Sequence, residues 1–121
     1  MLRHWFARRA ARLNFAEGVA AIDRGDTDLA LCWFTSAVRS CTEFGPGFLG
    51  RGLAHLRNGA YDAAIADLSE AIRLEGDARA FFLRALCYAG KGDRPRELAD
   101  RREALRRDPQ VAHALHDPCA G

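Results

Sequence analysis

A helical pattern of apolar positions runs along most of this chain and is interrupted at regular intervals by glycine. Tyr61, Ile65, Leu68 and Ile72 follow one another at steps of four, three and four residues, the spacing of one face of an α-helix. Similar runs lie on both sides of three glycines: Gly25, Gly59 and Gly92. The glycines are 34 and 33 residues apart. A repeat of this length with two helices per unit predicts a solenoid of stacked helical hairpins.

Each unit is expected to form a helix, a short turn and a second helix. The predicted repeats are 11–44, 45–77 and 78–110. Residues 1–10 are expected to extend the first helix, and residues 111–121 to contain the end of a capping helix and a tail. The predicted fold is therefore all-α, a right-handed solenoid of three hairpins with a short C-terminal capping helix.

Capping residues and proline indicate where several helices begin. Asp26 or Thr27 can cap a helix over about 27–40, and Asp93 can cap the sixth helix. Pro46 suits the first turn of the helix that follows the first repeat. A final helix is expected after Pro109, carrying Val111 and Leu115. Such a helix would cover the outer face of the last repeat, which has no neighbour.

Small residues recur at matching places in the repeats. Gly18, Gly52 and Ala85 occupy equivalent positions in the first helix of each unit, and Ala30 and Ala64 in the second. Small side chains at these places let the two helices of a hairpin approach closely, while large neighbours fill the remaining space.

This arrangement resembles the tetratricopeptide repeat family over about residues 11–110. The middle repeat carries the family pattern at Phe48, Gly52, Gly59, Tyr61, Ala64, Leu68 and Ala71. The third repeat carries it at Phe81, Ala85, Tyr88, Gly92, Ala104 and Pro109. The first repeat keeps Gly18, Gly25, Ala30, Phe34 and Ala37. The chain departs from the pattern at His55, Glu97 and Gly76.

The resemblance implies a concave groove lined by the first helix of each repeat, where family members bind peptides or partner helices. The corresponding groove residues in this chain are Arg12, Phe15, Val19, Ile22, Leu49, Leu53, Leu56, Arg57, Arg79, Phe82 and Leu86. Some relatives hold a C-terminal carboxylate with a polar clamp. The matching positions are Phe15, Val19, Gly50, Arg79 and Leu83, of which only Arg79 could serve. We therefore expect an apolar groove without that clamp.

A contiguous apolar groove is expected to be covered or used, because such surfaces are uncommon on soluble monomers. The favoured occupant is a peptide or amphipathic helix of a protein partner, which makes the chain an interaction adaptor. The groove could instead be covered by the N-terminal segment with Leu2, Trp5 and Phe6, or by a second copy in a self-assembling scaffold. A third interpretation is that several of these residues are simply core between repeats.

The distribution of charge gives little indication of nucleic-acid binding, which is the least favoured alternative. Net charge is only +2. The arginines of residues 94–107 are interleaved with acids, and Glu97–Arg101 and Glu103–Arg107 have the i,i+4 spacing of solvated helical faces. We also expect Glu17 and Arg51 to pair across the first repeat boundary.

The sequence predicts neither an enzyme nor a cofactor protein. It contains no phosphate-binding loop, carboxylate dyad or nucleophile–base motif. His113, His116 and Cys119 are spaced by three but lack a fourth zinc ligand, so no metal site is predicted. Cys32, Cys41 and Cys87 fall in predicted helices, where burial would leave them inert.

The expected compartment is the cytoplasm. No apolar run approaches the ~20 residues that span a bilayer, and no secretory signal is recognisable. The first 16 residues carry four arginines and no acid, and an organelle presequence is the alternative interpretation of that composition.

Overall fold

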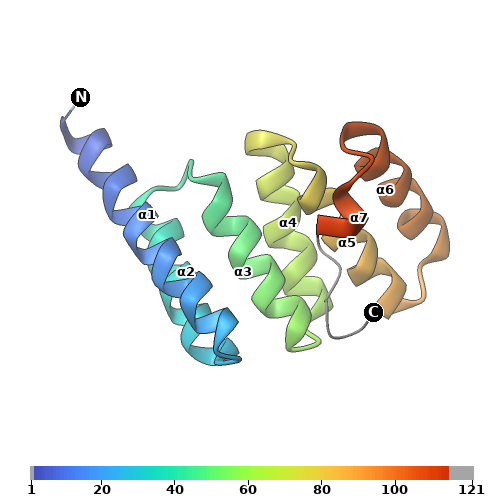
Figure 1. Cartoon of the computed structure of the whole chain (residues 1–121), viewed down its shortest axis with the longest axis horizontal. Helices are drawn as coiled ribbons and strands as arrows, with labels where there is room; N and C mark the ends of the chain where they lie inside the picture. The colour runs from blue at the N-terminus through green and yellow to red at the C-terminus, as the bar shows by residue number, and fades with distance from the viewer. Residues whose placement is uncertain (1, 115–121) are drawn as a thin grey trace.

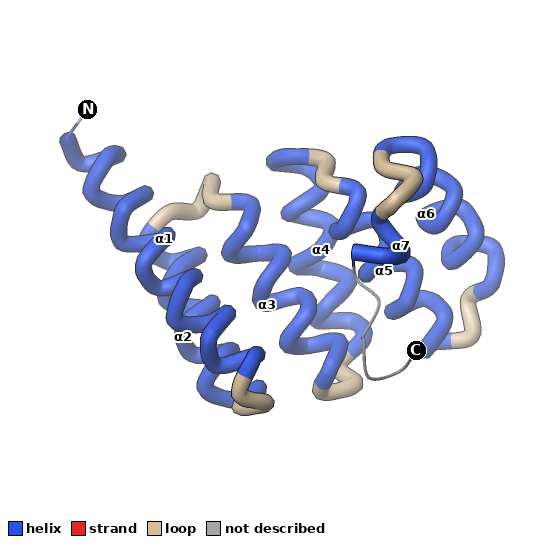
Figure 2. Tube along the Cα trace, in the orientation of Figure 1, coloured by secondary structure: helices blue, strands red, loops and turns tan. Residues whose placement is uncertain are grey.

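The computed structural model describes residues 2–114, and all regular structure in that range is helical. The helices are α1 (Leu2–Asp23), α2 (Thr27–Ser40), α3 (Gly45–Arg57), α4 (Tyr61–Glu75), α5 (Ala78–Lys91), α6 (Arg94–Arg107) and α7 (Val111–Ala114). Short loops join them (Figure 2). The predicted all-α solenoid of hairpins is confirmed. Within residues 2–114, no helix combines the length and apolar composition that crossing a membrane requires.

The helices pack as three consecutive hairpins in two rows (Figure 1). Helices α1 and α2, α3 and α4, and α5 and α6 form the hairpins. Across the stack, α1 contacts α3 and α3 contacts α5, whereas within residues 2–114 α2 does not contact α4 and α4 does not contact α6. The row formed by α1, α3 and α5 is therefore the tighter, inner row, and the concave face of the solenoid belongs to it.

The turn inside each hairpin requires glycine for its backbone conformation. Gly25, Gly59 and Gly92 have φ angles of 79°, 75° and 78°, in the left-handed region that side chains disfavour. A Cβ atom built on any of the three would have no neighbour within 4 Å. The 34-residue period of glycine in the sequence thus reflects backbone geometry and not limited space.

Three helices begin at an aspartate that caps the first turn. The backbone N–H of Leu29 donates to Asp26 Oδ1 at 3.1 Å, which selects Asp26 over Thr27 as the cap of α2. Asp77 accepts from the N–H of Arg79 at 2.7 Å, and Asp93 from that of Arg96 at 3.3 Å. Each bond satisfies an N–H that has no partner within the helix.

One aromatic side chain is packed between the first and second repeats. The ring of Phe34 on α2 is fully buried between Gly18 of α1 and Gly50 of α3. A Cβ atom added to either glycine would lie 2.5 Å from this ring. Gly52 makes the same kind of room for Leu68 within the second hairpin, with a Cβ-to-Cγ separation of 2.7 Å. The expectation that small residues permit close helix approach is therefore confirmed.

An arginine and an aspartate link the two helices of the second hairpin, and an equivalent pair links those of the third. Arg51 Nε donates to Asp67 Oδ2 at 2.8 Å, and Arg84 Nε donates to Asp100 Oδ2 at 2.7 Å. Both aspartates are buried. The predicted Glu17–Arg51 pair is wrong, because Glu17 is exposed and Arg51 is held by Asp67 inside its own hairpin.

Helix α7 covers the open end of the last hairpin. Val111 is fully buried and packs with Phe81 of α5 and Ala104 of α6. This contact provides the terminal cover that a solenoid needs. Leu115, the second residue expected to contribute, lies outside the described residues.

Candidate binding groove

A cavity of about 260 Å³ opens on the inner row of helices and crosses from α1 over α3 to α5. Its lining residues are Phe15, Val19, Ile22, Asp23, Phe34, Leu49, Gly50, Leu53, Arg57, Arg79 and Leu83. Side chains from three successive repeats therefore converge on one hollow. Most of them are apolar, and the three charged ones are Asp23, Arg57 and Arg79.

Seven of the eleven groove residues expected from the sequence line this cavity: Phe15, Val19, Ile22, Leu49, Leu53, Arg57 and Arg79. The other four lie elsewhere. Leu56 and Leu86 are half-buried and pack on the core between the second and third hairpins. Phe82 packs near Phe81 and Val111 under the guanidinium of Arg101, and Arg12 lines a separate hollow.

Leu49 and Leu53 have two roles in the structure. Both line the cavity, and both also pack against the buried cluster formed by the second and third hairpins. Val19 differs from them, because 39% of its surface is exposed and it belongs to no core cluster within residues 2–114. Val19 is therefore the apolar cavity residue whose replacement should perturb the fold least.

The five positions matched to a carboxylate clamp all line the cavity: Phe15, Val19, Gly50, Arg79 and Leu83. Of these, only Arg79 carries a hydrogen-bond donor in its side chain. Its guanidinium already donates to Asp77, with Nη2 at 2.8 Å from Oδ2. The geometry favours contact with apolar groups over capture of a carboxylate in the interior of the cavity.

Phe34 is the lining residue that sequence reasoning did not assign to the groove, because it belongs to α2 in the outer row. Its ring reaches the concave side between α1 and α3, since Gly18 and Gly50 present no side chain there. The signal in the sequence was the coincidence of an aromatic residue with glycines at facing positions of two neighbouring helices.

The charged edge of the cavity is partly neutralised. The side chain of Arg79 lowers the pKa of Asp77 by hydrogen bonding, aided by the backbone N–H of Arg79 and opposed by burial. Arg57 is exposed and forms no ion pair within residues 2–114. Arg57 is therefore the cavity cation that remains free to meet an acidic group of a bound segment.

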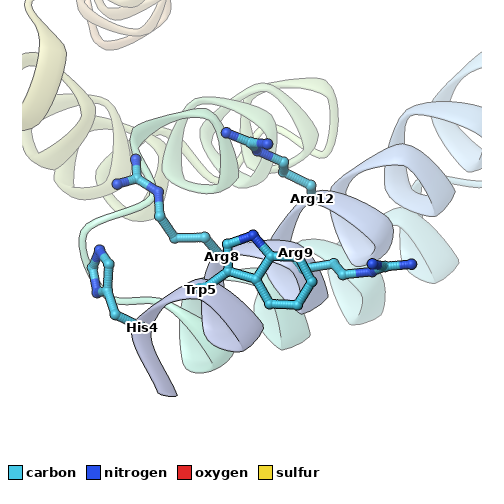
Figure 3. Close-up of a pocket in the computed structure, with 5 residues that line it drawn as sticks. All are labelled: His4, Trp5, Arg8, Arg9 and Arg12. Carbon is cyan, nitrogen blue, oxygen red and sulfur yellow. The ribbon is translucent and has the colours of Figure 1, made fainter. Parts of the chain in front are cut away.

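A second hollow lies on α1 alone and has a volume of about 660 Å³. Its lining residues are His4, Trp5, Arg8, Arg9 and Arg12, all from one helix (Figure 3). The guanidinium of Arg9 lies 5.4 Å from the centre of the Trp5 ring, and Phe6 meets the same indole edge to face. The N-terminal segment is part of the continuous helix α1, so it does not fold back over the groove as one alternative supposed.

The remaining chemistry does not converge on a site. Burial raises the pKa of the Cys87 thiol to about 11, and Cys41 is buried as well, but the expected burial of Cys32 is wrong because it is exposed. No group of three His, Cys, Asp or Glu side chains within residues 2–114 could hold a metal ion. Of the three candidate ligands in the tail, His116 and Cys119 lie outside the described residues.

Most arginines of α6 are engaged by carboxylates of the same helix or of its cap. Arg101 pairs with Glu97 at 3.1 Å and Arg107 with Glu103 at 2.7 Å, as the i,i+4 spacing predicted. The Arg106 and Arg107 side chains lower the pKa of Glu103 to about 2 through hydrogen bonds. Because these guanidinium groups have carboxylate partners, α6 offers less free positive charge to a nucleic acid than its composition suggests.

Residues 49–112 match the protein-family model described as tetratricopeptide repeat. The matched segment spans most of the second and third hairpins and reaches α7. No match was found among curated protein sequences.

Solved structures share the fold over most of the chain. The tetratricopeptide repeat domain of Arabidopsis OM64 is similar with a TM-score of 0.84 and 21% identity, covering 89% of this chain and 92% of that one. The first such domain of Spaghetti (RPAP3), solved with the HSP90 peptide SRMEEVD, has a TM-score of 0.82 and 17% identity over 89% and 91% of the two chains. The Yersinia enterocolitica type III secretion translocator chaperone SycD, in an alternative dimer, has a TM-score of 0.80 and 19% identity over 88% and 83%.

Proposed function

This chain belongs to the tetratricopeptide repeat family, and on that premise we propose that its concave groove binds an apolar segment of a protein partner. Members of the family are protein-interaction modules that are generally non-catalytic. The proposed activity is therefore that of an adaptor. The observation that carries the proposal is the convergence of Phe15, Val19, Leu49, Leu53 and Leu83 from three hairpins on one open cavity.

The shape and chemistry of the cavity indicate the kind of segment that would fit. Its apolar floor suits two or three large side chains of a short peptide or of one face of an amphipathic helix. Arg57, the lining cation without an ion pair within residues 2–114, favours an acidic group flanking those anchors. The domain of Spaghetti holds a short acidic peptide on the same fold. In this chain most positions of the polar clamp are apolar, so we expect side-chain anchors to contribute more than a terminal carboxylate.

The test uses peptides selected from a random display library on the purified 121-residue chain, with affinity measured by calorimetry. Val19→Glu should weaken binding of the selected peptides at least about tenfold, because a carboxylate would be desolvated against apolar groups. Leu29→Glu is the matched control, since Leu29 is exposed to a similar degree (37% against 39%) but lies on α2 away from the cavity.

Equal affinity of the Val19→Glu and Leu29→Glu variants for the selected peptides would refute the groove assignment. Light scattering on the free chain addresses the self-assembling alternative. A stable dimer that Val19→Glu dissociates would mean that a second copy occupies the groove.

A further inference from the structure

The N-terminal half of α1 exposes an unusual amount of apolar surface. Leu2, Trp5, Phe6 and Leu13 are 73%, 52%, 58% and 61% exposed. The whole of the remaining described chain contributes only three other large exposed apolar side chains: Val19, Leu29 and Leu105. A concentration of this kind marks an interaction surface.

Three of these four exposed apolar residues share one side of the helix. Leu2, Phe6 and Leu13 are four and seven residues apart, so they fall within about 40° of one another around the helix axis. The opposite side is used by the fold, because Ala7 and Ala11 pack against Cys41 and Phe44. The Leu2–Phe6–Leu13 stripe therefore faces away from the body of the solenoid.

Positive charge flanks this stripe over the first turns of α1, ahead of the acid Glu17. The first 16 residues contain Arg3, Arg8, Arg9 and Arg12 and no Asp or Glu. None of these four arginines forms an ion pair within residues 2–114, whereas five of the six arginines of α6 do. At 100° per residue, Arg9 and Arg12 lie on one side of the stripe and Arg3 on the other.

We propose that this face of α1 docks the protein peripherally on the surface of an anionic phospholipid bilayer. Leu2, Phe6 and Leu13 would enter the boundary between headgroups and acyl chains, as the apolar faces of interfacial helices do. The arginines would meet lipid phosphates, with their aliphatic stems along the apolar surface. The guanidinium of Arg9 lies 5.4 Å from the centre of the Trp5 ring. This pair would place an indole and a cation at the level of the lipid headgroups.

Charge and shape favour a bilayer over the other possible occupants. A second copy of α1 would bring eight arginines together with only four acids, Glu17 and Asp23 of each copy, so the two helices would repel each other. A nucleic acid would satisfy the arginines but leave the apolar stripe in water. An acidic protein segment would need a pocket for its apolar anchors, whereas the stripe lies on the convex outside of a helix. The adjoining hollow does not supply such a pocket, because it is lined mainly by arginine, histidine and indole (Figure 3).

The experiment is cosedimentation of the purified 121-residue chain with vesicles of phosphatidylcholine alone and of phosphatidylcholine mixed with phosphatidylglycerol. The chain should bind the anionic vesicles and not the neutral ones, and added salt should weaken binding. Replacing Arg3, Arg9 and Arg12, the arginines beside the stripe, one at a time by Gln should weaken binding about fivefold each. Phe6→Glu should abolish it, while Leu105→Glu on α6, also an exposed apolar site, should leave it unchanged.

Several results would overturn the proposal. These are absence of binding to the anionic vesicles, full binding by the Phe6→Glu variant, or complete competition by inorganic phosphate, which would indicate a simple anion site. A solution dimer that Phe6→Glu dissociates, or oligonucleotide binding that survives Phe6→Glu and exceeds vesicle binding, would assign the face to another partner. Circular dichroism confirms that each variant is folded. Val19→Glu should bind vesicles like the wild type, which separates this face from the peptide groove.

Discussion

At the scale of single residues, Phe34 and two glycines form the tightest described contact between the first two hairpins. The ring fills the space that Gly18 and Gly50 leave open and also forms part of the groove floor. Binding surface and fold therefore depend on the same side chain. Because both neighbours are glycines in helices, the packing has no room for even one additional methyl group on either side of the ring.

This contact predicts an unusual sign for a Gly→Ala substitution. Alanine in a helix normally stabilises relative to glycine by roughly 0.5–1 kcal/mol. At Gly50 the new Cβ would lie 2.5 Å from the Phe34 ring, so Gly50→Ala should instead destabilise by about 1–3 kcal/mol. Urea unfolding measures the change. The double variant Gly50→Ala/Phe34→Leu should be more stable than the Phe34→Leu variant, because the new methyl group fills part of the space that the ring left. A Gly50→Ala protein more stable than the wild type would contradict this packing.

At the scale of helices, the caps connect the local sequence to the groove. Asp77 caps α5 and also holds the guanidinium of Arg79, which lines the cavity. One aspartate thus starts the helix and places a cation at the edge of the binding surface. Asp77→Ala should cost about 0.5–2 kcal/mol at pH 7 through loss of the cap.

The lowered pKa of Asp77 predicts how this contribution depends on pH. Arg79 holds the pKa of the folded state below the ordinary value of 3.8, so the ionised carboxylate stabilises the fold at pH values above 3.8. That stabilisation should be lost as pH falls through the folded-state pKa. Asp77→Asn keeps a capping oxygen but cannot ionise, so its stability deficit in urea unfolding should be largest near neutral pH. A deficit that stays constant down to low pH would show that the Arg79 contact does not contribute.

The paired arginine and aspartate of successive hairpins show what a repeat-by-repeat comparison can find. Arg51 and Asp67 are 16 residues apart, and so are Arg84 and Asp100. The sequence-based expectation paired Arg51 with Glu17 across the repeat boundary instead. The sequence did contain a signal for the correct pairing, because Asp67 and Asp100 occupy equivalent places in the second helices of their repeats. An acid that recurs with the repeat can pair with the arginine of each repeat.

At the scale of the whole molecule, each hairpin of residues 2–114 contacts only the hairpins next to it. Stability in such a stack is a sum of local terms and interfaces, so a defect at one end should spread little. The C-terminal end is covered by Val111, which is fully buried against Phe81 and Ala104.

Val111→Asp should therefore loosen the third hairpin selectively. Burying a carboxylate at this position should cost about 1–3 kcal/mol and undock α7. Hydrogen exchange should accelerate in α5 and α6 and remain nearly unchanged in α1 and α2. His113→Asp is the control, because His113 is exposed on the same short helix. Uniform acceleration across all three hairpins would mean that the stack unfolds as a single cooperative unit.

The sequence by itself determined the repeat, the hairpins and the positions of their turns. Those features depend on local rules: helical periodicity, glycine where φ must be positive, and aspartate where a helix begins. It also identified most of the cavity lining, because residues at equivalent places of stacked helices share a face. Tertiary structure decided what depends on distances between helices. It placed Phe34 in the groove, moved Leu56, Phe82 and Leu86 into packing contacts, and left the arginines of α1 without partners. Periodicity gives the side of its helix on which a residue lies, but only the packed neighbours determine what that side meets.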